Sequence, residues 1–409
     1  MVAGKVPRIL VLIDQYWPHM GGAEAVAKTI CDLLQGREFE FSVVTRNFSG
    51  ELPKTETVDG VRITRLGTSR SRKISKIQFM FSAIGYLIRH RRDYDLVHVH
   101  LQQLDIDLLS AFIASWVTGQ PYVLHVHRSE AVPWMLKLKE EHPFLNLFKP
   151  NPLPGWLYRS ALRRASLILT VESTSADLLE RRGIGRTRYL PNAVRLRDGR
   201  AGSEGKEELR KRLGLTPDAT IVVAVGVLRK EKNILTLLKA WAEMAGRQSN
   251  GSMELVILGG TDNSSNSNEA ELRAFASEHG LESVLFKGSV SNVGDYLKAA
   301  DIYVHPSFVE GMSLAILEAM NCKLPVVVSD IPGNRDLVPS DEYGLRFDPR
   351  HSEELASGLQ KLAMDRDLRR NLGERALRRV NEEFSLERLT QKVASLYREV
   401  VAAENGAGG

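Results

Sequence analysis

Cysteine is scarce in this chain of 409 residues, which contains only Cys31 and Cys322. Both lie within apolar patterns typical of helices, and two isolated cysteines provide neither a disulfide framework nor the paired spacing of a zinc site. The sequence therefore excludes the small, disulfide-stabilised class of secreted protein. We expect two buried thiols in a reducing compartment.

Long apolar runs are also missing. No stretch approaches the roughly 20 apolar residues that a membrane-spanning helix needs, and Ile9–Ile13 is too short to be the core of a signal sequence. We therefore expect a cytoplasmic protein, either soluble or peripheral on the inner face of the membrane.

No strong excess of one charge is present, because 55 Lys and Arg stand against 50 Asp and Glu, which gives a net charge of +5. This excess is small for a nucleic-acid-binding protein, and we expect no nucleic acid partner. It suits an anionic small ligand or an anionic membrane surface.

Hydrophobic residues make up 43% of the chain, enough to bury the cores of two domains. Short apolar runs alternate with helical patterns in both halves, which predicts doubly wound parallel sheets of the Rossmann type. Ligands of such sheets bind beyond the carboxyl ends of the strands. The main expected strands are Ile9–Asp14, Phe39–Thr45, Leu96–His100, Tyr122–His127, Leu167–Val171, Ile221–Gly226, Leu255–Gly259, Val284–Phe286, Ile302–His305 and Val326–Ser329.

The segment Val194–Glu208 is rich in glycine and charge and has little hydrophobic pattern. Such composition is typical of a connection between domains. The sequence therefore predicts an N-terminal domain over residues 1–193 and a C-terminal domain over residues 194–384.

The most informative segment runs from Glu310 to Glu318, between the strand Ile302–His305 and a helical pattern that begins at Ser313. Glu310 lies in the loop before the helix, beside backbone N–H groups that attract anions. Glu318 lies five residues into the helix, about 7.5 Å along its axis. Two carboxylates so placed suit the two ends of a nucleotide sugar, although glutamate near a helix start also simply favours the helix dipole.

A second loop carries positive charge. Arg229 and Lys232 lie between the strand Ile221–Gly226 and a helix that begins near Asn233. Two cations beside a helix start would neutralise a diphosphate leaving group. The alternative is a solvated run of charge.

Gly21 and Gly22 follow the first strand and open a helix, where the backbone of a glycine loop approaches phosphate closely. The dinucleotide-binding glycine pattern is absent there, so an ordinary turn is the alternative.

Histidines alternate on two strands, with His98 and His100 on one and His125 and His127 on the other. Residues two apart share a strand face, and His127 falls at the carboxyl end of its strand. No carboxylate joins the four histidines at ligand spacing, so we expect no metal site.

Several segments, in order and with matching gaps, resemble the donor-site signature of glycosyltransferase family 4. They are His305–Ser307, Glu310-Gly311, Glu318–Met320 and Pro325–Val327. The resemblance implies a GT-B fold, an α/β architecture of two Rossmann-like doubly wound domains that face a central cleft. It also implies that the C-terminal helix, 385–409, returns to the N-terminal, acceptor-binding domain, while residues 194–384 bind the donor.

The resemblance further implies a retaining, hexosyltransferase-type glycosyltransferase. Such an enzyme moves a sugar from a nucleotide-sugar donor, a UDP- or GDP-sugar, to an acceptor hydroxyl, without a cofactor or a metal. The lipid-linked or saccharide acceptor would belong to cell-envelope glycolipid or polysaccharide synthesis. The alternatives are a sugar-nucleotide epimerase of the same fold and a non-catalytic binding scaffold.

The family resemblance assigns roles to individual residues. The catalytic set it implies is His127, Glu310, Arg229 and Lys232. The donor-binding set consists of Gly21, Gly22, Gly226, Arg229, Lys232, Gly288, Val290, Glu310, Gly311, Met312, Ser313, Leu314 and Glu318. The residues expected to bind acceptor are His19, His100 and Arg128.

The chain departs from the family pattern in three places. Val227 stands where many members carry arginine, and Arg229 is expected to take that role. Lys323 replaces a usual glycine, and Gly259–Asp262 replaces a short Gly-Pro turn. These departures concern donor preference rather than the presence of the site.

A basic amphipathic helix is expected over about residues 75–91, with Arg89, Arg91 and Arg92 at or just beyond its end. Basic residues beside an apolar face can bind an anionic membrane surface. A core helix with a solvated rim is the alternative.

Overall fold

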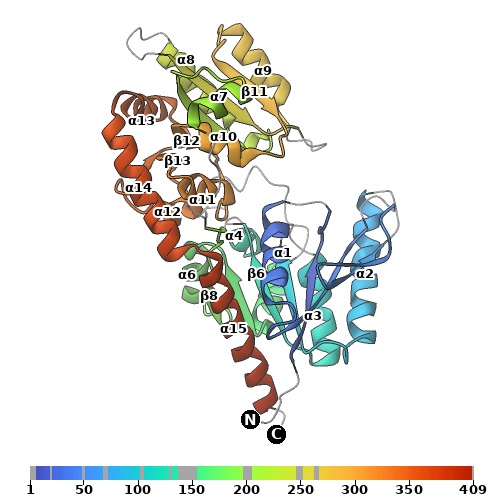
Figure 1. Ribbon diagram of the computed structural model, residues 1–409. Helices are drawn as coiled ribbons and strands as arrows, with labels where there is room; N and C mark the ends of the chain where they lie inside the picture. The colour runs from blue at the N-terminus through green and yellow to red at the C-terminus, as the bar shows by residue number, and fades with distance from the viewer. Residues whose placement is uncertain are drawn as a thin grey trace. The chain divides into compact units, whose positions relative to one another are not determined.

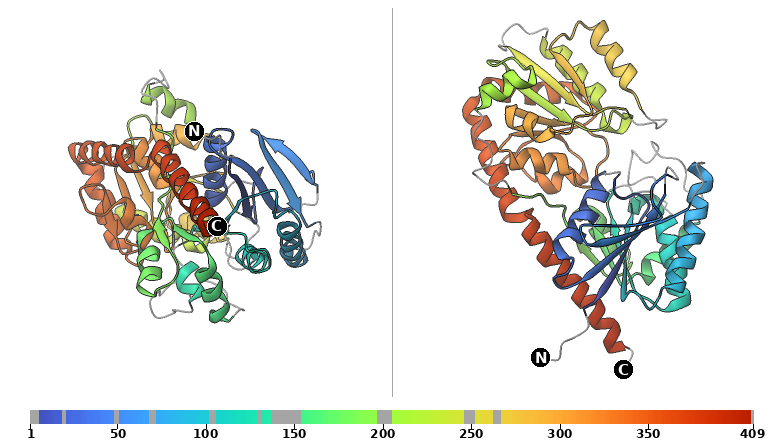
Figure 2. Two further views of the ribbon diagram at one scale, coloured as in Figure 1. Left: turned by 90° about the horizontal axis from the view of Figure 1, so that it is seen from below. Right: turned by 45° about the vertical axis from the view of Figure 1, so that its right-hand side comes forward.

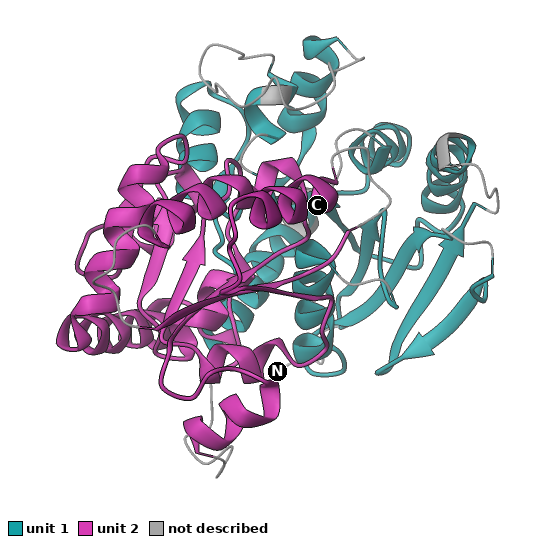
Figure 3. Cartoon of the chain, turned by 90° about the horizontal axis from the view of Figure 1, so that it is seen from above, with its two compact units in different colours: residues 1–192, 387–409 teal, residues 193–386 magenta. Residues whose placement is uncertain are grey.

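The computed structural model describes residues 6–18, 21–47, 51–67, 72–101, 106–128, 131–136, 154–196, 205–245, 252–261 and 267–407. The chain divides into two compact units, which Figure 3 colours separately. Unit 1 comprises residues 1–192 and 387–409, and unit 2 comprises residues 193–386. Among the described helices, none combines the length and the apolar character required to cross a bilayer.

Unit 1 is built on an eight-stranded sheet in the order β3-β4-β2-β1-β5-β6-β7-β8. Every neighbouring pair is parallel except the hairpin of β3 and β4. The strands are β1 (Arg8–Ile13), β2 (Glu40–Arg46), β3 (Thr55–Val58), β4 (Val61–Leu66), β5 (Leu96–Leu101), β6 (Tyr122–Val126), β7 (Leu167–Thr170) and β8 (Thr187–Tyr189). Buried residues run without interruption along β5 and β6, because helices cover both faces of a parallel sheet.

The helices of unit 1 cover its sheet from two sides, as the labels of Figure 1 and the right-hand view of Figure 2 show. Phe79 and Leu87 of α2 join Val97 and Val99 of β5 in one core cluster. Tyr397 of α15 instead meets His98, which lies on the opposite face of β5. The helices are α1 (Gly22–Leu34), α2 (Arg72–Arg89), α3 (Ile106–Thr118), α4 (Ala131–Met135), α5 (Gly155–Arg164), α6 (Ser173–Arg181) and α15 (Leu386–Ala407).

Unit 2 holds a six-stranded sheet in the order β11-β10-β9-β12-β13-β14. All of its pairs are parallel. The strands are β9 (Thr220–Val225), β10 (Met253–Leu258), β11 (Val284–Gly288), β12 (Ile302–His305), β13 (Val326–Ser329) and β14 (Leu345–Phe347). The two parallel sheets confirm the predicted fold class of two doubly wound α/β domains.

The helices of unit 2 pack a second core, in which Trp241 and Leu237 meet Leu255 and Ile257 of the sheet. They are α7 (Lys206–Leu213), the short 3-10 turn η3 (Lys230–Lys232), α8 (Ile234–Ala245), α9 (Glu269–Glu278), α10 (Val293–Ala299), α11 (Leu314–Asn321), α12 (Pro332–Leu337), α13 (Ser352–Met364) and α14 (Arg366–Glu383).

The strand order of unit 2 reverses at β9. From β9 the chain first adds β10 and β11 on one side and then returns to place β12 on the other. The carboxyl ends of β9 and β12 therefore flank the switch point, where doubly wound sheets bind their ligands.

Candidate active site

Two loops of opposite charge leave the sheet of unit 2 at its switch point. The first follows β9 and carries Lys232, and the second follows β12 and carries Glu310. Because β9 and β12 are neighbouring parallel strands, their carboxyl ends lie at one edge. The Nζ atom of Lys232 donates a hydrogen bond to Oε1 of Glu310, so the structure joins two residues that the sequence predicted separately.

Hydrogen bonds from a side-chain amide and from the backbone also hold the two loops together. Asn233 is buried and adopts a positive φ of 55°, a conformation that asparagine tolerates better than most residues. Its Nδ2 donates to the carbonyls of Pro306, at 3.0 Å, and Pro349, at 2.8 Å. The N–H of Phe308 donates to the carbonyl of Glu231 at 2.9 Å. These contacts fix the distance between the basic and the acidic loop.

The carboxylate of Glu310 is anchored on one side. Its Oε1 accepts from Lys232, from Nε2 of His305 at 2.9 Å and from Oγ of Ser307 at 2.8 Å. No described residue donates to Oε2. Burial alone would raise the pKa of Glu310, but the charge of Lys232 and the contacts with His305 outweigh it and hold this pKa well below its usual range. Glu310 is therefore an anion at neutral pH, with one oxygen available to a ligand.

The start of α11 follows directly after the loop that carries Glu310. Ser313 is the N-cap, and its Oγ accepts from the N–H of Ile316 at 3.4 Å. Gly311, Met312 and Leu314 border the same helix start, where backbone N–H groups favour an anion.

Glu318 lies further along α11 with an exposed side chain. Partial burial of its carboxyl group still raises the pKa of Glu318 above the usual value. Tyr303 is completely buried, and burial together with the charges of Glu310 and Glu318 raises the pKa of its phenol. Both carboxylates are therefore close enough to Tyr303 to act on its phenol.

Arg229 lies in the basic loop but does not contact Glu310 in the structure. Its Nη1 is 3.5 Å from Oε1 of Glu231, within the same turn. Val227, which takes the position usually occupied by arginine, is exposed at 39% of its surface. The predicted role of Arg229 at a diphosphate remains a prediction.

The loops after β9, β10 and β11 are packed backbone to backbone. A Cβ atom on Gly259 would lie 1.9 Å from the carbonyl oxygen of Gly226, and the φ of Gly259 is +132°. The N–H of Gly259 donates to the carbonyl of Gly288 at 2.8 Å. Only glycine fits at position 259, so the departure from the usual Gly-Pro turn keeps a tight turn. The structure thus brings Gly226 and Gly288 together, and Val290 follows two residues later.

Gly333, at the start of α12, packs closely against the backbone of the loop that carries Glu310. A Cβ atom there would lie 1.3 Å from the carbonyl oxygen of Gly311. We predict that Gly333→Ala displaces the loop that carries Glu310, because overpacking a tight contact costs about 1–3 kcal/mol. Thermal unfolding should show a lower Tm, and nucleotide sugar should no longer raise it.

Gly294→Ala is the matched control, because Gly294 also lies in the first turn of a helix of unit 2 and its added Cβ meets nothing within 4 Å. Equal Tm values for the two variants would show that the contact between Gly333 and the loop is not tight.

The glycine loop of unit 1 already has a carboxylate at its helix start. The N–H of Gly21 donates to Oε2 of Glu24 at 3.1 Å. Gly22 begins α1, and a Cβ atom on it would meet nothing within 4 Å. A phosphate at Gly21 would have to displace the carboxylate of Glu24. His19, the first residue predicted to bind acceptor, lies outside the described residues.

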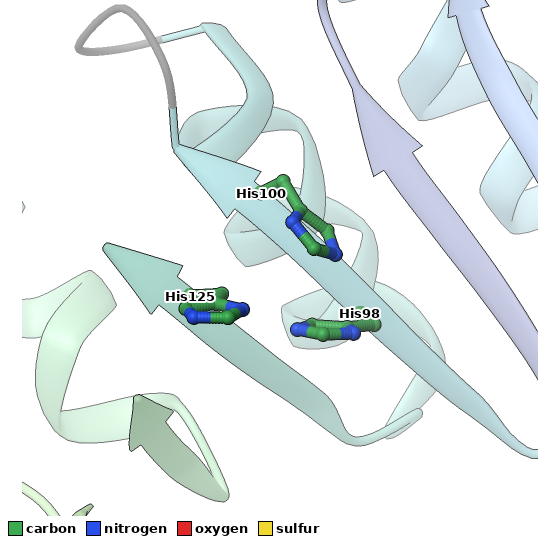
Figure 4. A group of neighbouring side chains, drawn as sticks. All are labelled: His98, His100 and His125. Carbon is green, nitrogen blue, oxygen red and sulfur yellow. The ribbon is translucent and has the colours of Figure 1, made fainter. Parts of the chain in front are cut away.

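Two histidines of β5, one of β6 and His127 directly after β6 lie side by side on one face of the unit 1 sheet, and Figure 4 shows three of them. Nδ1 of His98 is 2.5 Å from the hydroxyl of Tyr397, and Nδ1 of His100 is 2.9 Å from Nε2 of His127. Burial lowers the pKa of His98 and of His127 to about 3, so both rings are neutral at pH 7.

These contacts change the interpretation of His100. The sequence predicted that it would bind acceptor, but its side chain has no exposed surface and its Nδ1 faces His127. In this structure it contacts His127 rather than solvent, and its role in acceptor binding stays a prediction. Arg128, the next residue in the chain, is half-buried beyond the strand end.

One nitrogen from each of His98, His100 and His125 lies within 4.8 Å of the other two. Two imidazole nitrogens bound to one tetrahedral zinc ion are about 3.3 Å apart, given zinc–nitrogen bonds of 2.0–2.1 Å. No carboxylate of the described residues joins the three. A limit of 4.8 Å includes that separation, so the expectation that these three buried rings bind no metal stays a prediction.

Sequence reasoning did not single out Tyr303, Ser307 or Asn233 as site residues, and it used His305 only as part of a motif. A signal was present for Tyr303 and His305, because residues 303 and 305 share one face of a strand. The contacts of Asn233 reach residues 306 and 349 and leave no local signal.

Comparison with known proteins agrees with this geometry. Residues 205–379 match a family model described as "Glycosyl transferases group 1", and residues 21–193 match one described as "Glycosyl transferase 4-like domain".

Relatives and solved structures resemble about three quarters of the chain or more. The "Alpha-D-kanosaminyltransferase" of Streptomyces kanamyceticus is 26% identical over 74% of this chain and 77% of its own length. The "UDP-Gal:alpha-D-GlcNAc-diphosphoundecaprenol alpha-1,3-galactosyltransferase" of Escherichia coli is 24% identical over 96% of this chain and 98% of its own. The Anabaena protein HepE, solved in complex with UDP-glucose, superposes with a TM-score of 0.75 over 96% of this chain and 99% of its own, at 20% identity, and so shows the same fold.

Proposed function

Since the chain belongs to the glycosyl transferases group 1 of family 4 and has their GT-B fold, we propose that it is a retaining hexosyltransferase of cell-envelope synthesis. It transfers a sugar from a UDP- or GDP-sugar to a hydroxyl of a lipid-linked or saccharide acceptor. The names of relatives support this choice, since the E. coli protein is named for a UDP-Gal donor and a diphosphoundecaprenol acceptor. HepE was solved with UDP-glucose.

The anchored carboxylate of Glu310 is the observation that carries the proposal. Three donors hold its Oε1, and no described residue donates to Oε2. Oε2 accepts hydrogen bonds from hydroxyls of the donor sugar. A fixed anion beside the sugar stabilises the positive charge that develops at the anomeric carbon, and a carboxylate already held in place does not need to reorganise during the reaction.

Bond exchange at the anomeric carbon follows from this arrangement. The bond between the sugar and the nucleoside diphosphate breaks, and its electron pair remains on the diphosphate oxygen. The acceptor oxygen forms the new bond on the same face, and its proton passes to the departing diphosphate. Lys232, the N-terminus of α11 and Arg229 stabilise the negative charge that accumulates there.

The other donor contacts are assigned from the loops of unit 2. The exposed carboxylate of Glu318 accepts from ribose hydroxyls, and the backbones of Gly288 and Val290 hold the base. Gly311, Met312, Ser313 and Leu314 border the sugar and its phosphates. Because cationic side chains and N–H groups serve the diphosphate, the donor site needs no metal or cofactor.

Unit 1 keeps the roles that the family resemblance gives it. His127 contacts the transferred sugar as a neutral imidazole, and Arg128 contributes to acceptor binding. Gly21 and Gly22 approach the donor phosphates once the carboxylate of Glu24 is displaced.

A donor screen tests the proposal. Purified protein is incubated with UDP-, GDP-, ADP- and dTDP-sugars, with and without EDTA, and scored for thermal shift and for release of nucleoside diphosphate. One UDP- or GDP-sugar should raise the Tm and release diphosphate slowly, at the same rate in EDTA. Release that stops in EDTA would refute the metal-free site, and an epimerised donor without release would indicate an epimerase.

The configuration of the product tests retention. With the accepted donor and an acceptor glycolipid, the new glycosidic bond should have the same anomeric configuration as the donor. An inverted product would refute the retaining mechanism.

The membrane proposal rests on α2. Ile74, Ile77 and Phe81 are exposed at 53%, 56% and 64% of their surfaces, and their spacing places them on one stripe of the helix. Arg89 ends the helix, and Arg91 and Arg92 follow it on the surface. An apolar stripe with cations at one end fits an anionic bilayer surface.

We predict that Phe81→Ser weakens binding to vesicles of phosphatidylcholine and phosphatidylglycerol, measured by co-sedimentation. Trp156→Ser is the control, because Trp156 is equally exposed, at 67%, but lies on α5. Binding should also fall when phosphatidylglycerol is omitted or when salt is added. Unchanged sedimentation of the Phe81 variant would remove α2 from the proposal.

A further inference from the structure

A chain of buried side chains reaches from the core of unit 2 to the carboxylate of Glu310. Tyr303 and His305 lie on one face of β12, and the phenol oxygen of Tyr303 is 3.0 Å from Nδ1 of His305. Nε2 of the same ring is 2.9 Å from Oε1 of Glu310. Tyr303 has no exposed surface and His305 has 3%, so neither group exchanges these partners for water.

The chemistry of the two ends determines the tautomer of His305. Glu310 is an anion that only accepts hydrogen bonds, so Nε2 of His305 must carry the hydrogen that points to it. In the tautomer that carries its single hydrogen on Nε2, Nδ1 is an acceptor, and the hydroxyl of Tyr303 donates to it. A tyrosine whose pKa is raised by burial and by neighbouring carboxylates keeps its proton for this purpose.

The backbone that follows His305 is held by hydrogen bonds as well. Oγ of Ser329 donates to the carbonyl of Ser307 at 2.5 Å, and Nδ2 of Asn334 donates to Oγ of Ser329 at 3.1 Å. Ser307 donates its hydroxyl to the same Oε1 that His305 contacts. The ring of His305 therefore has a fixed position and a fixed tautomer.

From these contacts we propose that Tyr303 and His305 are positioning residues for the transfer reaction. Tyr303 selects the tautomer of His305, and His305 binds one oxygen of Glu310 so that the other is turned to the donor sugar. The inference rests on the proposed role of Glu310. It assigns a function to Tyr303, which no motif of the sequence indicated.

Substitutions distinguish the proposed role of Tyr303 in orienting His305 from a role in packing alone. Tyr303→Phe removes only the hydroxyl, and we expect kcat with the donor to fall about tenfold, by analogy with the 10–100-fold effects known for groups that orient the side chains bound to a metal ion. The affinity for UDP alone should stay the same, because Glu310 acts on the sugar. Tyr296→Phe is the matched control, since Tyr296 is a buried tyrosine of α10 with no hydrogen bond to the site among the described residues.

Two replacements of His305 test the direction of the contact. The amide nitrogen of His305→Gln lies near the former Nε2 and can still donate to Glu310, whereas that of His305→Asn lies near the former Nδ1 and cannot reach it. His305→Gln should therefore retain more kcat than His305→Asn, at similar UDP affinity. Equal losses in both variants would overturn the proposal.

Nuclear magnetic resonance gives a readout that does not depend on the donor. In protein labelled with ¹⁵N-histidine, the His305 signals, assigned by their loss in His305→Asn, should report hydrogen on Nε2. In Tyr303→Phe they should shift toward a mixture of tautomers. An unchanged tautomer would overturn the role of Tyr303.

The enzymatic assays use UDP-glucose and UDP as probes, with the donor selected by the screen in place of UDP-glucose if the two differ. If Glu310→Gln has no effect on transfer, the proposed function fails. If Glu310→Gln abolishes transfer while Tyr303→Phe and His305→Asn leave it unchanged, only the positioning role fails.

Discussion

Glu310→Gln should lower kcat about 10²–10³-fold, which corresponds to about 2.7–4 kcal/mol of lost transition-state stabilisation. The amide keeps the shape of the side chain but removes the charge that would stabilise the developing cation. Lys232 also loses the anion that pairs with it. Steady-state kinetics with the accepted donor measure the effect, and the Tm shift by UDP should persist because the diphosphate contacts remain.

Two other glutamates serve as comparisons for Glu310. Glu318→Gln should chiefly raise the KM for the donor, since Glu318 is assigned to the ribose. Glu342→Gln should change neither constant, because Glu342 lies on the surface of unit 2 and, among the described residues, pairs with Arg375 alone, at 3.3 Å. Equal, slight effects of Glu310→Gln and Glu318→Gln would remove the assignment of the donor site.

Glu310→Gln should also change the stability of the protein in a way that depends on pH. The pKa of Glu310 is depressed in the folded protein, so this carboxylate contributes stability above its unfolded pKa of about 4.3. That contribution disappears as the pH falls through the folded pKa. Thermal unfolding should therefore show the largest difference between Glu310→Gln and the parent protein at neutral pH, and little difference in strong acid.

Lys232→Met should lower kcat/KM by about 10²–10³-fold, because it removes a cation assigned to the leaving diphosphate. It also leaves Glu310 buried without its ion pair. Burial then raises the pKa of Glu310, since the charge of Lys232 no longer opposes it. The acid limb of the profile of kcat/KM against pH should move toward neutrality in the variant.

Lys230→Met is the control for Lys232. Lys230 lies two residues away in the same 3-10 turn, and its side chain is exposed. The Lys230→Met variant should retain the kinetic constants and the pH profile of the parent protein. A loss of similar size in both variants would show that the net charge of the loop, rather than the contact between Lys232 and Glu310, governs the reaction.

The sequence by itself determined most of the strands, the order of the motifs and the class of enzyme, but it missed the short edge strands β8 and β14. Runs such as Leu96–Leu101 and Thr220–Val225 are apolar at almost every position, because both faces of a parallel strand are buried. The capping serine at 313 and the glycine turns are equally local signals. Each of these features depends on residues a few positions apart, so a linear reading finds it.

The tertiary structure decided which groups face one another. Lys232 and Glu310 are 78 residues apart and meet only because β12 pairs with β9. The sequence did not show that His100 is buried with its Nδ1 against His127. The glycines at 259 and 333 are required by backbone atoms of other loops. Such contacts follow from strand order and from packing between distant segments. The sequence around each residue therefore does not predict them.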